Sequence, residues 1–588
     1  MNERREILTE LLIAVVLSAV IAAVWLTAMN GWKAEHWSAP LSYQESGVTA
    51  DTLWLLAGFK AAEEGDLGFF KRITIPRLGA PFGARWDDFP WTEKAVFVFP
   101  GIVAGWIGLY PAMNLAVLLA HVLAGVSFYA AARMMNVDRV WSAAGAFVFA
   151  LSRYAFAHGA HHLNITLFWH VPLCLVVCRW ISLGEGLPQR GSRFWIAVGI
   201  AFVAGTQNIY YTNIFIQLAA LGALVQWIRH GWKNAWPGFV ICGVSILAVL
   251  LMNVNTLVAW ATEGVNTGAV VRYYQWVEFY ALKVADLFIP YPDHSAWGDF
   301  GRSYIKGVLI LGELPPGSYL GLIGIAGLVW LGLETFLRMV KRPETGIPLE
   351  SVQIGWIVLY SVVGGINGLI GAAGIQLFRA TTRYSVVILA LALLFLVRRL
   401  SPLTRGRDAL AAGMVCIMAS IAIWDQTAPW TTDEQIEKAT RTIASDKAFT
   451  EAMESRLPQG AMVFQLPIID FPERVEGKFS GYENFRPYLY SKHLRFSFGT
   501  VKGRPRQDWH NDLKQLGMRE AIGTLERYGF AGLFVNLNGF PGHGDEITQT
   551  LRQVGRGDVI VSDAGDLVVM LLQPSANPVL PERAPPAQ

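Results

Sequence analysis

The sequence predicts a polytopic α-helical membrane protein that ends in a soluble α+β domain, and three observations lead to this prediction. Hydrophobic residues make up 53% of the 588 residues and charged residues only 16%, whereas roughly 25% of a typical soluble domain is charged. Apolar runs of about 20 residues, the length that crosses a membrane, recur as far as residue 425. Beyond residue 426 the apolar runs shorten to strand length. We therefore expect a membrane module at 1–425 and a soluble domain at 426–588.

The first apolar run, 11–29, is long enough to span a hydrocarbon core at ~1.5 Å per residue. Its end, Ala28-Met29-Asn30, is a poor cleavage site, and the run exceeds the ~7–15 apolar residues of a signal peptide, so we expect a retained span. Together with later runs it predicts about eleven transmembrane helices. The later runs are 111–134, 140–157, 164–182, 194–208, 210–228, 236–256, 317–339, 350–372, 379–399 and 407–425.

The positions of the basic residues predict the orientation. They precede the first span or lie in short connections, which the positive-inside rule assigns to the cytoplasm. An odd number of spans then puts the N-terminus in the cytoplasm and the C-terminus outside, together with the long polar stretches 30–110 and 257–316. The basic residues concerned are Arg4, Arg5, Arg133, Arg139, Arg179, Arg190, Arg193, Arg229, Lys233, Arg338, Lys341, Arg342, Arg398, Arg399, Arg405 and Arg407.

Asp51 is the candidate reacting group. It begins an amphipathic segment, 51–65, whose pattern predicts a helix lying in the membrane interface. A carboxylate just past the first span lies where both water and a lipid headgroup can reach it. The alternative is that Thr49 or Asp51 only caps this helix. Capping and catalysis do not exclude each other.

The same outer loop contains three further features. Residues 76–83 are rich in proline and glycine and predict turns. Asp87 and Asp88 lie side by side between aromatic residues. Segment 94–109 is apolar and meets the next span without a basic break, so we expect a helix embedded near the outer surface.

Two polar groups lie at the outer ends of predicted spans. The spacing of His158, His161 and His162 allows them to face one way, toward a phosphate or a metal, although polar residues also simply end membrane helices at the interface. Arg379 and Arg383 open a span one turn apart, where an unpaired charge is costly and usually functional. We expect these arginines to contact an anionic headgroup.

The outer loop 257–316 interleaves aromatic and charged residues. Aromatic rings stack on sugar rings and cations pair with phosphate oxygens, so this mixture suits a phosphorylated sugar, although any interfacial loop contains similar residues. The candidate ligand-binding residues in this loop are Arg272, Glu278, His294 and Glu313.

The region after 426 predicts a mixed fold. Helical patterns cover 432–456 and 513–528, and Asp563-Ala-Gly-Asp566 is typical of a hairpin turn. Segment 482–506 is aromatic and basic, and could either close over the membrane site or form a solvated surface. The expected strands are 462–467, 494–498, 533–537, 559–562 and 567–572.

Charge and cysteine content give no indication of a nucleic-acid partner or of a cysteine metal site. The net charge of +3 is too small to indicate a nucleic-acid partner. The four cysteines lie in apolar segments without metal-ligand spacing, which is typical of small core residues.

The order of these features resembles the GT-C class of integral-membrane glycosyltransferases: a first span, an outer loop that opens at Asp51, a second acidic site at Asp87 and Asp88, many spans, and an outer C-terminal domain. Several short motifs further resemble the large bacterial YfhO-like membrane proteins. The Trp-Trp-Asp motif of oligosaccharyltransferases is missing from the sequence, so we do not expect transfer of whole glycans to asparagine. The YfhO-like motifs are Leu78-Gly-Ala-Pro-Phe-Gly83, Glu278-Phe-Tyr-Ala-Leu-Lys283, Phe288-Ile-Pro290 with His294, the Arg379 and Arg383 pair, and Gly529-Phe-Ala-Gly-Leu-Phe-Val535.

The resemblance implies an enzyme of the bacterial inner membrane, which takes a sugar from a polyprenyl-phosphate donor on the outer face and passes it to a glycan, lipid or protein acceptor. The first-loop acid of that class is the general base, and Asp51 has the matching position. Asp87 or Asp88 would position the acceptor or hold a divalent cation, Mg or Mn, and no other cofactor is implied. The residues expected to hold the leaving phosphate are Arg272, Arg379, Arg383, His161 and His162.

Two other functions remain open. A flippase for a lipid-linked sugar would place polar residues at mid-membrane depth in broken helices, and the polar stretch 207–213 fits that description except that the topology puts it at an outer hairpin. A scaffold whose outer domain binds cell-wall glycan is the third interpretation. The lack of an inverted repeat and the concentration of charge on one face favour the enzyme.

Overall fold

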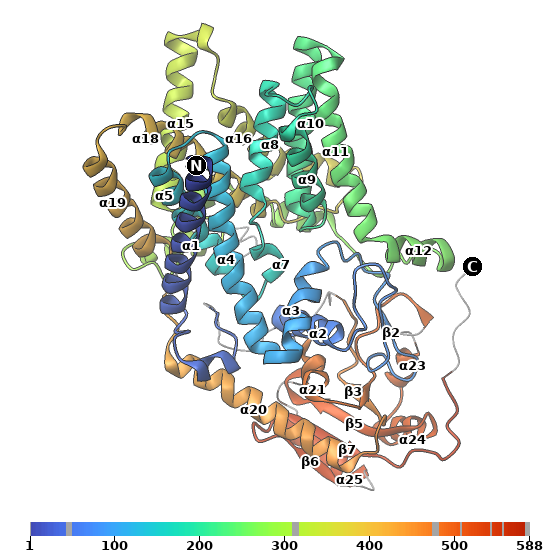
Figure 1. Cartoon of the computed structure of the whole chain (residues 1–588). Coiled ribbons are helices and arrows are strands. Elements are labelled where there is room, and N and C mark those ends of the chain that lie inside the picture. The colour runs from blue at the N-terminus through green and yellow to red at the C-terminus, as the bar shows by residue number, and fades with distance from the viewer. Residues whose placement is uncertain are drawn as a thin grey trace.

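The computed structural model separates a helical bundle from a sheet-containing region (Figure 1). The start of the first helix lies at the end of the bundle that points away from the sheet. Glu313 lies outside the described residues. The structure describes residues 2–42, 50–308, 317–427, 429–472, 481–505, 509–540, 542, 544–554 and 558–581.

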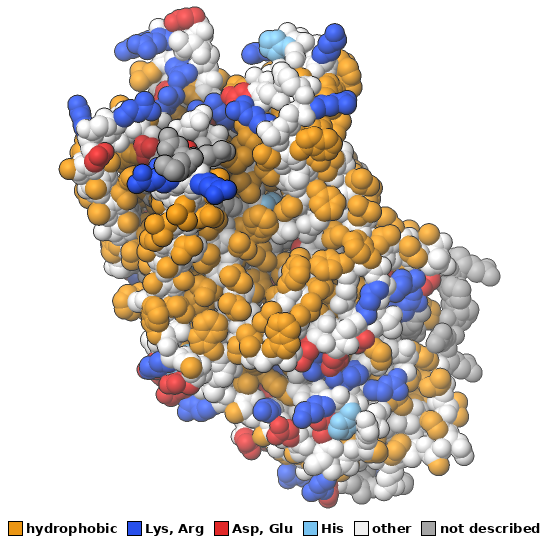
Figure 2. Space-filling view, in the orientation of Figure 1, with side chains coloured by type: hydrophobic (Ala, Val, Ile, Leu, Met, Phe, Trp, Pro, Cys, Tyr) orange, Lys and Arg blue, Asp and Glu red, His pale blue; other side chains and the backbone are white. Residues whose placement is uncertain are grey.

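Eight helices of the described residues are long and apolar enough to cross a membrane, which confirms a polytopic helical membrane protein. Figure 2 shows the apolar belt that their side chains form across the bundle. The eight are α1 (Asn2–Ala28), α4 (Leu109–Met134), α5 (Arg139–Ala150) with its continuation α6 (Arg153–His158), α10 (Ile209–His230), α11 (Trp232–Met252), α15 (Gly321–Lys341), α18 (Ser385–Leu403) with the preceding turn η4 (Thr381–Tyr384), and α19 (Asp408–Gln426).

Three of the expected spans are shorter helices of 13 or 14 residues, each only about 20 Å long. The runs 164–182 and 350–372 are each interrupted, the second between Ser361 and Ile366, where Val362 is extended and Gly364 has a φ of +71°. The short helices still pack within the bundle, for example α8 against α10 and α9 against α11. The elements concerned are α7 (Leu163–Thr166), α8 (Val171–Leu183), α9 (Ser192–Gly205), α16 (Leu349–Ser361) and α17 (Ile366–Ala372).

The short basic connections meet at one end of the bundle, opposite the sheet, where Figure 2 shows lysine and arginine side chains. Glutamate side chains form ion pairs with arginines from connections that are distant in sequence. The basic connections therefore lie close together at one face of the bundle, as the sequence predicted. Which membrane face this is stays a prediction. The bridging pairs are Glu10 with Arg133 and Arg139, Glu350 with Arg179 and Arg398, and Glu334 with Arg338 and Arg399.

The C-terminal region forms a five-stranded sheet in the order β4-β3-β5-β7-β6. The first three of these are parallel, whereas β7 is antiparallel to both β5 and β6. The expected turn at 563–566 joins β6 to β7. The strands are β3 (Met462–Leu466), β4 (Arg495–Phe496), β5 (Phe530–Asn536), β6 (Val559–Val561) and β7 (Leu567–Leu571).

Alternate residues of this sheet pack on two sides, as the period of a strand requires. Phe534 and Val569 belong to the large core that includes α20 (Asp433–Arg456). Leu533 and Met570 belong to a separate core that includes α24. The remaining helices of this region are η5 (Glu483–Phe485), α21 (Arg486–Tyr490), α23 (His510–Leu513), α24 (Met518–Arg527), η6 (Leu537–Gly539) and α25 (Gly544–Val554).

The first outer loop is built onto this sheet. The Phe496 N–H donates to the Arg77 carbonyl over 2.8 Å, and the Gly79 N–H donates to the Phe498 carbonyl over 3.0 Å, so residues 77–80 lie along the edge of β4. The other elements outside the bundle are η1 (Ala34–Ser38), α2 (Ala50–Glu63), β1 (Thr74–Ile75), β2 (Ala84–Arg85), α3 (Ala95–Ile107), α12 (Val254–Glu263), α13 (Tyr274–Phe279), η2 (Val284–Leu287), α14 (Gly298–Gly307) and η3 (Pro343–Thr345).

The helix expected at 51–65 forms as α2, but the expectation that it lies in the membrane interface is wrong. Leu53, Leu56 and Phe59 are fully buried, because α3 covers one side of α2 and α21 and η5 cover another. In contrast, α3 leaves Phe99 and Trp106 60% and 80% exposed, as expected for a helix embedded near a membrane surface.

Arg486 holds α21 to the sheet region, and its removal should destabilise the fold. Its buried guanidinium donates to both oxygens of Asp446, over 2.8 and 2.5 Å, and to Asp566 over 2.7 Å. Arg486→Ala leaves Asp446 buried without this partner, and we expect a loss on the order of 3–5 kcal/mol. The thermal unfolding midpoint of the full chain in detergent measures the effect.

The matched control is Arg456→Ala, because Arg456 pairs with Asp558 over 2.9 Å at the exposed surface, where such pairs add little. Equal midpoints for the two variants would contradict the role given to Arg486.

Candidate active site at the start of α2

Asp51 lies in the first turn of α2 and faces the turn between α6 and α7. Its Oδ2 atom is 3.0 Å from His162 Nε2, and its side chain is 42% exposed. Helix α2 begins at Ala50, so Asp51 lies inside its first turn and is not the residue that precedes it, whereas Thr49, the other capping candidate, lies outside the described residues. The next residue, Thr52, contacts His161 Nδ1 through its hydroxyl over 3.0 Å. Two neighbouring residues of α2 therefore hold two neighbouring histidines.

The electrostatic surroundings keep Asp51 ionised. The protein around this partly exposed carboxyl displaces water from its charge, and this desolvation alone would raise its pKa. The hydrogen bond with His162, together with the charge interactions of both histidines and Arg383, outweighs burial and lowers the pKa below its ordinary value. Asp51 therefore carries its negative charge at neutral pH and is available to accept a proton.

The two arginines predicted to open a span have different surroundings. Arg383, on η4, places its guanidinium 4.6 Å from the centre of the Tyr210 ring, and its charge acts on Asp51. Arg379 stacks on Trp276 and Tyr280 of the α13 region at 5.0 and 5.5 Å. Of the pair, Arg383 is the one whose charge the structure brings to Asp51.

Glu93 is a second carboxylate of this site that the sequence interpretation missed. Its Oε1 atom accepts the amide of Asn164 over 3.0 Å and that of Asn208 over 3.4 Å. Burial raises the pKa of Glu93, and the asparagine bonds and the charge of Arg383 offset this only in part. The sequence signal that could have identified Glu93 is an acidic residue just before the apolar helix α3. Its partners Asn164 and Asn208 follow α6 and precede α10, far away in sequence.

Asp51, His161, His162, Glu93 and Arg383 therefore form one polar cluster. Each is only partly exposed, whereas neighbouring residues of α2 and α18 are buried. The sequence predicted four of these five residues. An ionised carboxylate, a carboxyl with a raised pKa and a guanidinium side by side can remove a proton and hold an anion.

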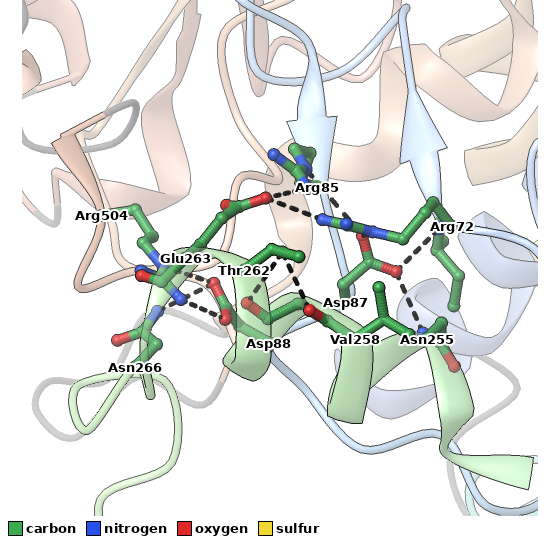
Figure 3. A network of polar contacts seen from close by, with 12 residues as sticks. Arg72, Arg85, Asp87, Asp88, Asn255, Val258, Thr262, Glu263, Asn266 and Arg504 are labelled. Atoms are coloured by element: carbon green, nitrogen blue, oxygen red, sulfur yellow. Dashed lines mark hydrogen bonds and ion pairs between the residues drawn. The ribbon is translucent and has the colours of Figure 1, made fainter. Parts of the chain in front are cut away.

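Asp87 and Asp88 lie in a different network, which Figure 3 shows. Asp87 accepts from Arg72 over 2.7 Å and from Asn255 over 3.0 Å. Both oxygens of Asp88 accept from Arg504 over 2.8 Å. These contacts tie the first outer loop to α12 and to the C-terminal region.

This geometry gives Asp87 and Asp88 a structural role and does not favour the expected acceptor or metal role. Their oxygens already receive arginine and asparagine donors, and both side chains are buried. In the part of the chain that the structure describes, no group of three His, Cys, Asp or Glu residues is placed to hold a metal ion.

The other predicted ligand-binding residues have structural contacts. Glu278 accepts the Tyr274 hydroxyl over 2.8 Å and the Gly364 N–H over 3.0 Å. His294 is buried against Asp425 at 3.2 Å. Arg272 is partly exposed in the segment before α13.

No protein-family model matches the sequence, and no match was found among curated proteins. The oligosaccharyltransferase of Archaeoglobus fulgidus, in complex with zinc and sulfate, is similar at 12% identity with a TM-score of 0.47, covering 96% of this chain and 74% of that chain.

ArnT from Cupriavidus metallidurans is similar at 13% identity. Its apo structure has a TM-score of 0.42 over 95% of this chain and 97% of that chain. Its structure bound to undecaprenyl phosphate has a TM-score of 0.41 over 96% and 98%. TM-scores below 0.5 do not establish a shared fold, so the chemistry must be argued from the site.

If Asp88 is structural, Asp88→Asn should lower the thermal unfolding midpoint of the full chain, because Arg504 loses a charged partner, at a cost on the order of 1–3 kcal/mol. Neither EDTA nor Mg²⁺ should move the midpoint of the wild type. Asp299→Asn is the matched control, since Asp299 is 99% exposed. A Mg²⁺-dependent rise that Asp88→Asn abolishes would instead support a cation at this position.

Proposed function

We propose that the protein is a GT-C-type membrane glycosyltransferase, which moves a sugar from a polyprenyl-phosphate donor to a glycan, lipid or protein acceptor on the outer face of the bacterial inner membrane. The observation that carries the proposal is the ionised Asp51, paired with His162 and acted on by the charge of Arg383, at the sheet end of a membrane bundle.

Asp51 is the general base in this reaction. The acceptor hydroxyl oxygen bonds to the anomeric carbon, its proton passes to Asp51, and the bond between that carbon and the phosphate oxygen breaks with its electrons going to the phosphate. His162 holds the carboxylate in place at 3.0 Å. Polyprenyl phosphate leaves with the negative charge.

Arg383 stabilises that charge. A guanidinium beside a leaving phosphate stabilises the transition state more than the ground state, because charge develops on the phosphate as the bond breaks. The charge of Arg383 also acts on the carboxyl group of Glu93. A neutral Glu93 is compatible with a phosphate here and can donate a hydrogen bond, whereas an ionised Glu93 would repel it.

The surroundings of Arg379 suit the lipid part of such a donor. In the segment before it, Leu369, Ile375 and Leu377 are 69%, 62% and 56% exposed. A polyprenyl phosphate has an anionic phosphate and a long apolar chain. Arg379 can pair with the phosphate, and the exposed apolar side chains beside it can contact the prenyl chain.

The flippase remains a second candidate because two of the expected spans are interrupted at α7 and before α17. Polar residues also pair inside the bundle: Asn213 donates to the Tyr384 hydroxyl over 2.8 Å, and Trp356 donates to Gln217 over 3.0 Å. These polar groups form hydrogen bonds with one another. A substrate path would be better served by polar groups whose hydrogen bonds are available to the substrate.

Replacing Asp51 should abolish transfer without abolishing donor binding. Asp51→Asn keeps the shape of the side chain but cannot accept the proton, so we expect a fall of about 10²–10⁴-fold. The assay follows labelled sugar from membrane-extracted polyprenyl-phosphate sugars with purified full chain, and donor binding is measured separately.

Asp299→Asn serves as the control for loss of an exposed carboxylate. Unchanged transfer by Asp51→Asn would remove the proposed base. Donor binding without transfer by either the wild type or the variant would instead call for a flipping assay in reconstituted vesicles.

The pH dependence should show both carboxylates. Transfer needs ionised Asp51, whose pKa is lowered by His162 and Arg383 against desolvation, so activity should persist as the pH falls to the ordinary pKa of an aspartate and be lost only below it. Transfer also needs neutral Glu93, whose pKa is raised by burial, so activity should fall again as the pH rises through that pKa.

Glu93→Gln cannot ionise and should lose the alkaline fall while donor binding is retained. The charged group that acts on Glu93 is Arg383 of η4, and its hydrogen-bond partners are the amides of Asn164 and Asn208. Glu451→Gln, on the exposed face of α20, is the control. The same alkaline fall in Glu93→Gln would assign that limb to another group.

A further inference from the structure

A cavity of about 670 Å³ lies at the end of the bundle opposite the sheet. Three parts of the chain line it: the first turns of α1, the connection from α4 to α5, and the connection from α18 to α19. It is far from the Asp51 cluster along α1, because Asp51 follows the other end of that helix. The lining residues are Glu6, Ile7, Glu10, Arg133, Asp138, Arg139, Val140, Thr404, Arg405, Gly406, Asp408 and Ala411.

Some of the charged groups in this cavity are fixed by internal contacts. Glu10 accepts from Tyr129 over 2.5 Å, from Arg133 over 3.0 Å and from Arg139 over 2.9 Å. Asp138 accepts from the Ser401 hydroxyl over 2.7 Å and from the backbone at the start of α5. These groups form a rigid polar base to the cavity.

Three charged residues of the lining are free to meet a ligand. Glu6, Arg405 and Asp408 are exposed, and none of them forms an ion pair with another residue that the structure describes. The cavity thus offers one cation and two carboxylates that lie outside the ion pairs of the described residues, although the charge of Glu6 also acts on Arg139. A purely anionic ligand would meet the carboxylates, and a purely cationic ligand would meet the arginine.

The helices beside the cavity present apolar surface to the membrane. In Figure 1, α5 lies between α1 and α19, and α5 packs against both. Leu11 and Val15 of α1 follow the lining residue Ile7 by one and two turns, and they are 57% and 65% exposed. Apolar side chains therefore continue from the cavity toward the middle of the membrane, where acyl chains lie.

We propose that this cavity binds a phospholipid whose headgroup carries both a phosphate and an ammonium group, as phosphatidylethanolamine does. Arg405 pairs with the phosphate, Glu6 and Asp408 accept from the ammonium group, and the acyl chains lie along α1 and α19. The mixed charge selects a zwitterionic headgroup over an anionic one, and the apolar flanks select a lipid over a soluble zwitterion.

The test measures lipid binding to the purified full chain by native mass spectrometry, with dioleoyl phosphatidylethanolamine, dioleoyl phosphatidylglycerol and soluble glycerophosphoethanolamine as probes. Wild type should bind the ethanolamine lipid most tightly. Arg405→Gln should weaken both lipids about fivefold, the effect of one basic group near a lipid phosphate. Asp408→Asn should weaken the ethanolamine lipid only.

Arg342→Gln and Glu344→Gln are matched controls, because both residues are exposed at the same end of the bundle but outside the cavity. Equal binding of the two lipids to wild type, or equal effects of Arg405→Gln and Arg342→Gln, would overturn the proposal. Binding of the soluble headgroup as tightly as the lipid would assign the cavity to a free zwitterion instead. None of these outcomes depends on the transferase assay.

Discussion

The pairing of the first outer loop with the C-terminal sheet is the constraint on which the site depends. A long loop that lies under other structure must satisfy its backbone polar groups. Residues 77–80 do so against the edge of β4, and Trp86 donates its ring N–H to the Gly499 carbonyl over 2.7 Å. The loop thereby becomes part of the sheet region, and α2, which carries Asp51, is buried beneath α21 as a consequence.

Within the site, environment separates the roles of two carboxylates. Asp51 has a histidine within hydrogen-bond distance, so its charged form is favoured despite burial. Among the described residues the hydrogen-bond donors to Glu93 are amides, which together with the charge of Arg383 offset burial only in part, so its pKa is raised. Two acids whose pKa values move apart can act as base and hydrogen-bond donor at the same pH.

The sequence predicts the features that follow from the free-energy cost of placing charged and polar residues in a membrane. It does not predict the features that depend on contacts between distant segments of the chain. Arg383 and the histidine turn could be identified from the sequence, because charged and polar residues at the ends of membrane spans are costly and are usually functional. Glu93 was missed because its place in the site depends on hydrogen bonds from Asn164 and Asn208, which are distant in the sequence. The interfacial position predicted for α2 failed because hydropathy cannot show that residues 483–490 cover it. The breaks in the helices at 164–182 and 350–372 were not predicted, because an apolar run continues through a break in the helix.

Adjacent residues connect the site to the network in Figure 3. While Glu93 faces Asn164 and Asn208, the Lys94 ammonium donates to Asn255 and to the Phe69 carbonyl, each over 2.6 Å. Asn255 in turn donates to Asp87, which Arg72 holds. Burial lowers the pKa of Lys94 to about 8, so these acceptors and the nearby Asp87 are what keep it charged. The contacts of Asp88 with Arg504, of Asn255 with Asp87 and of Lys94 with Asn255 thus join the sheet region to the short segment of chain that carries Glu93.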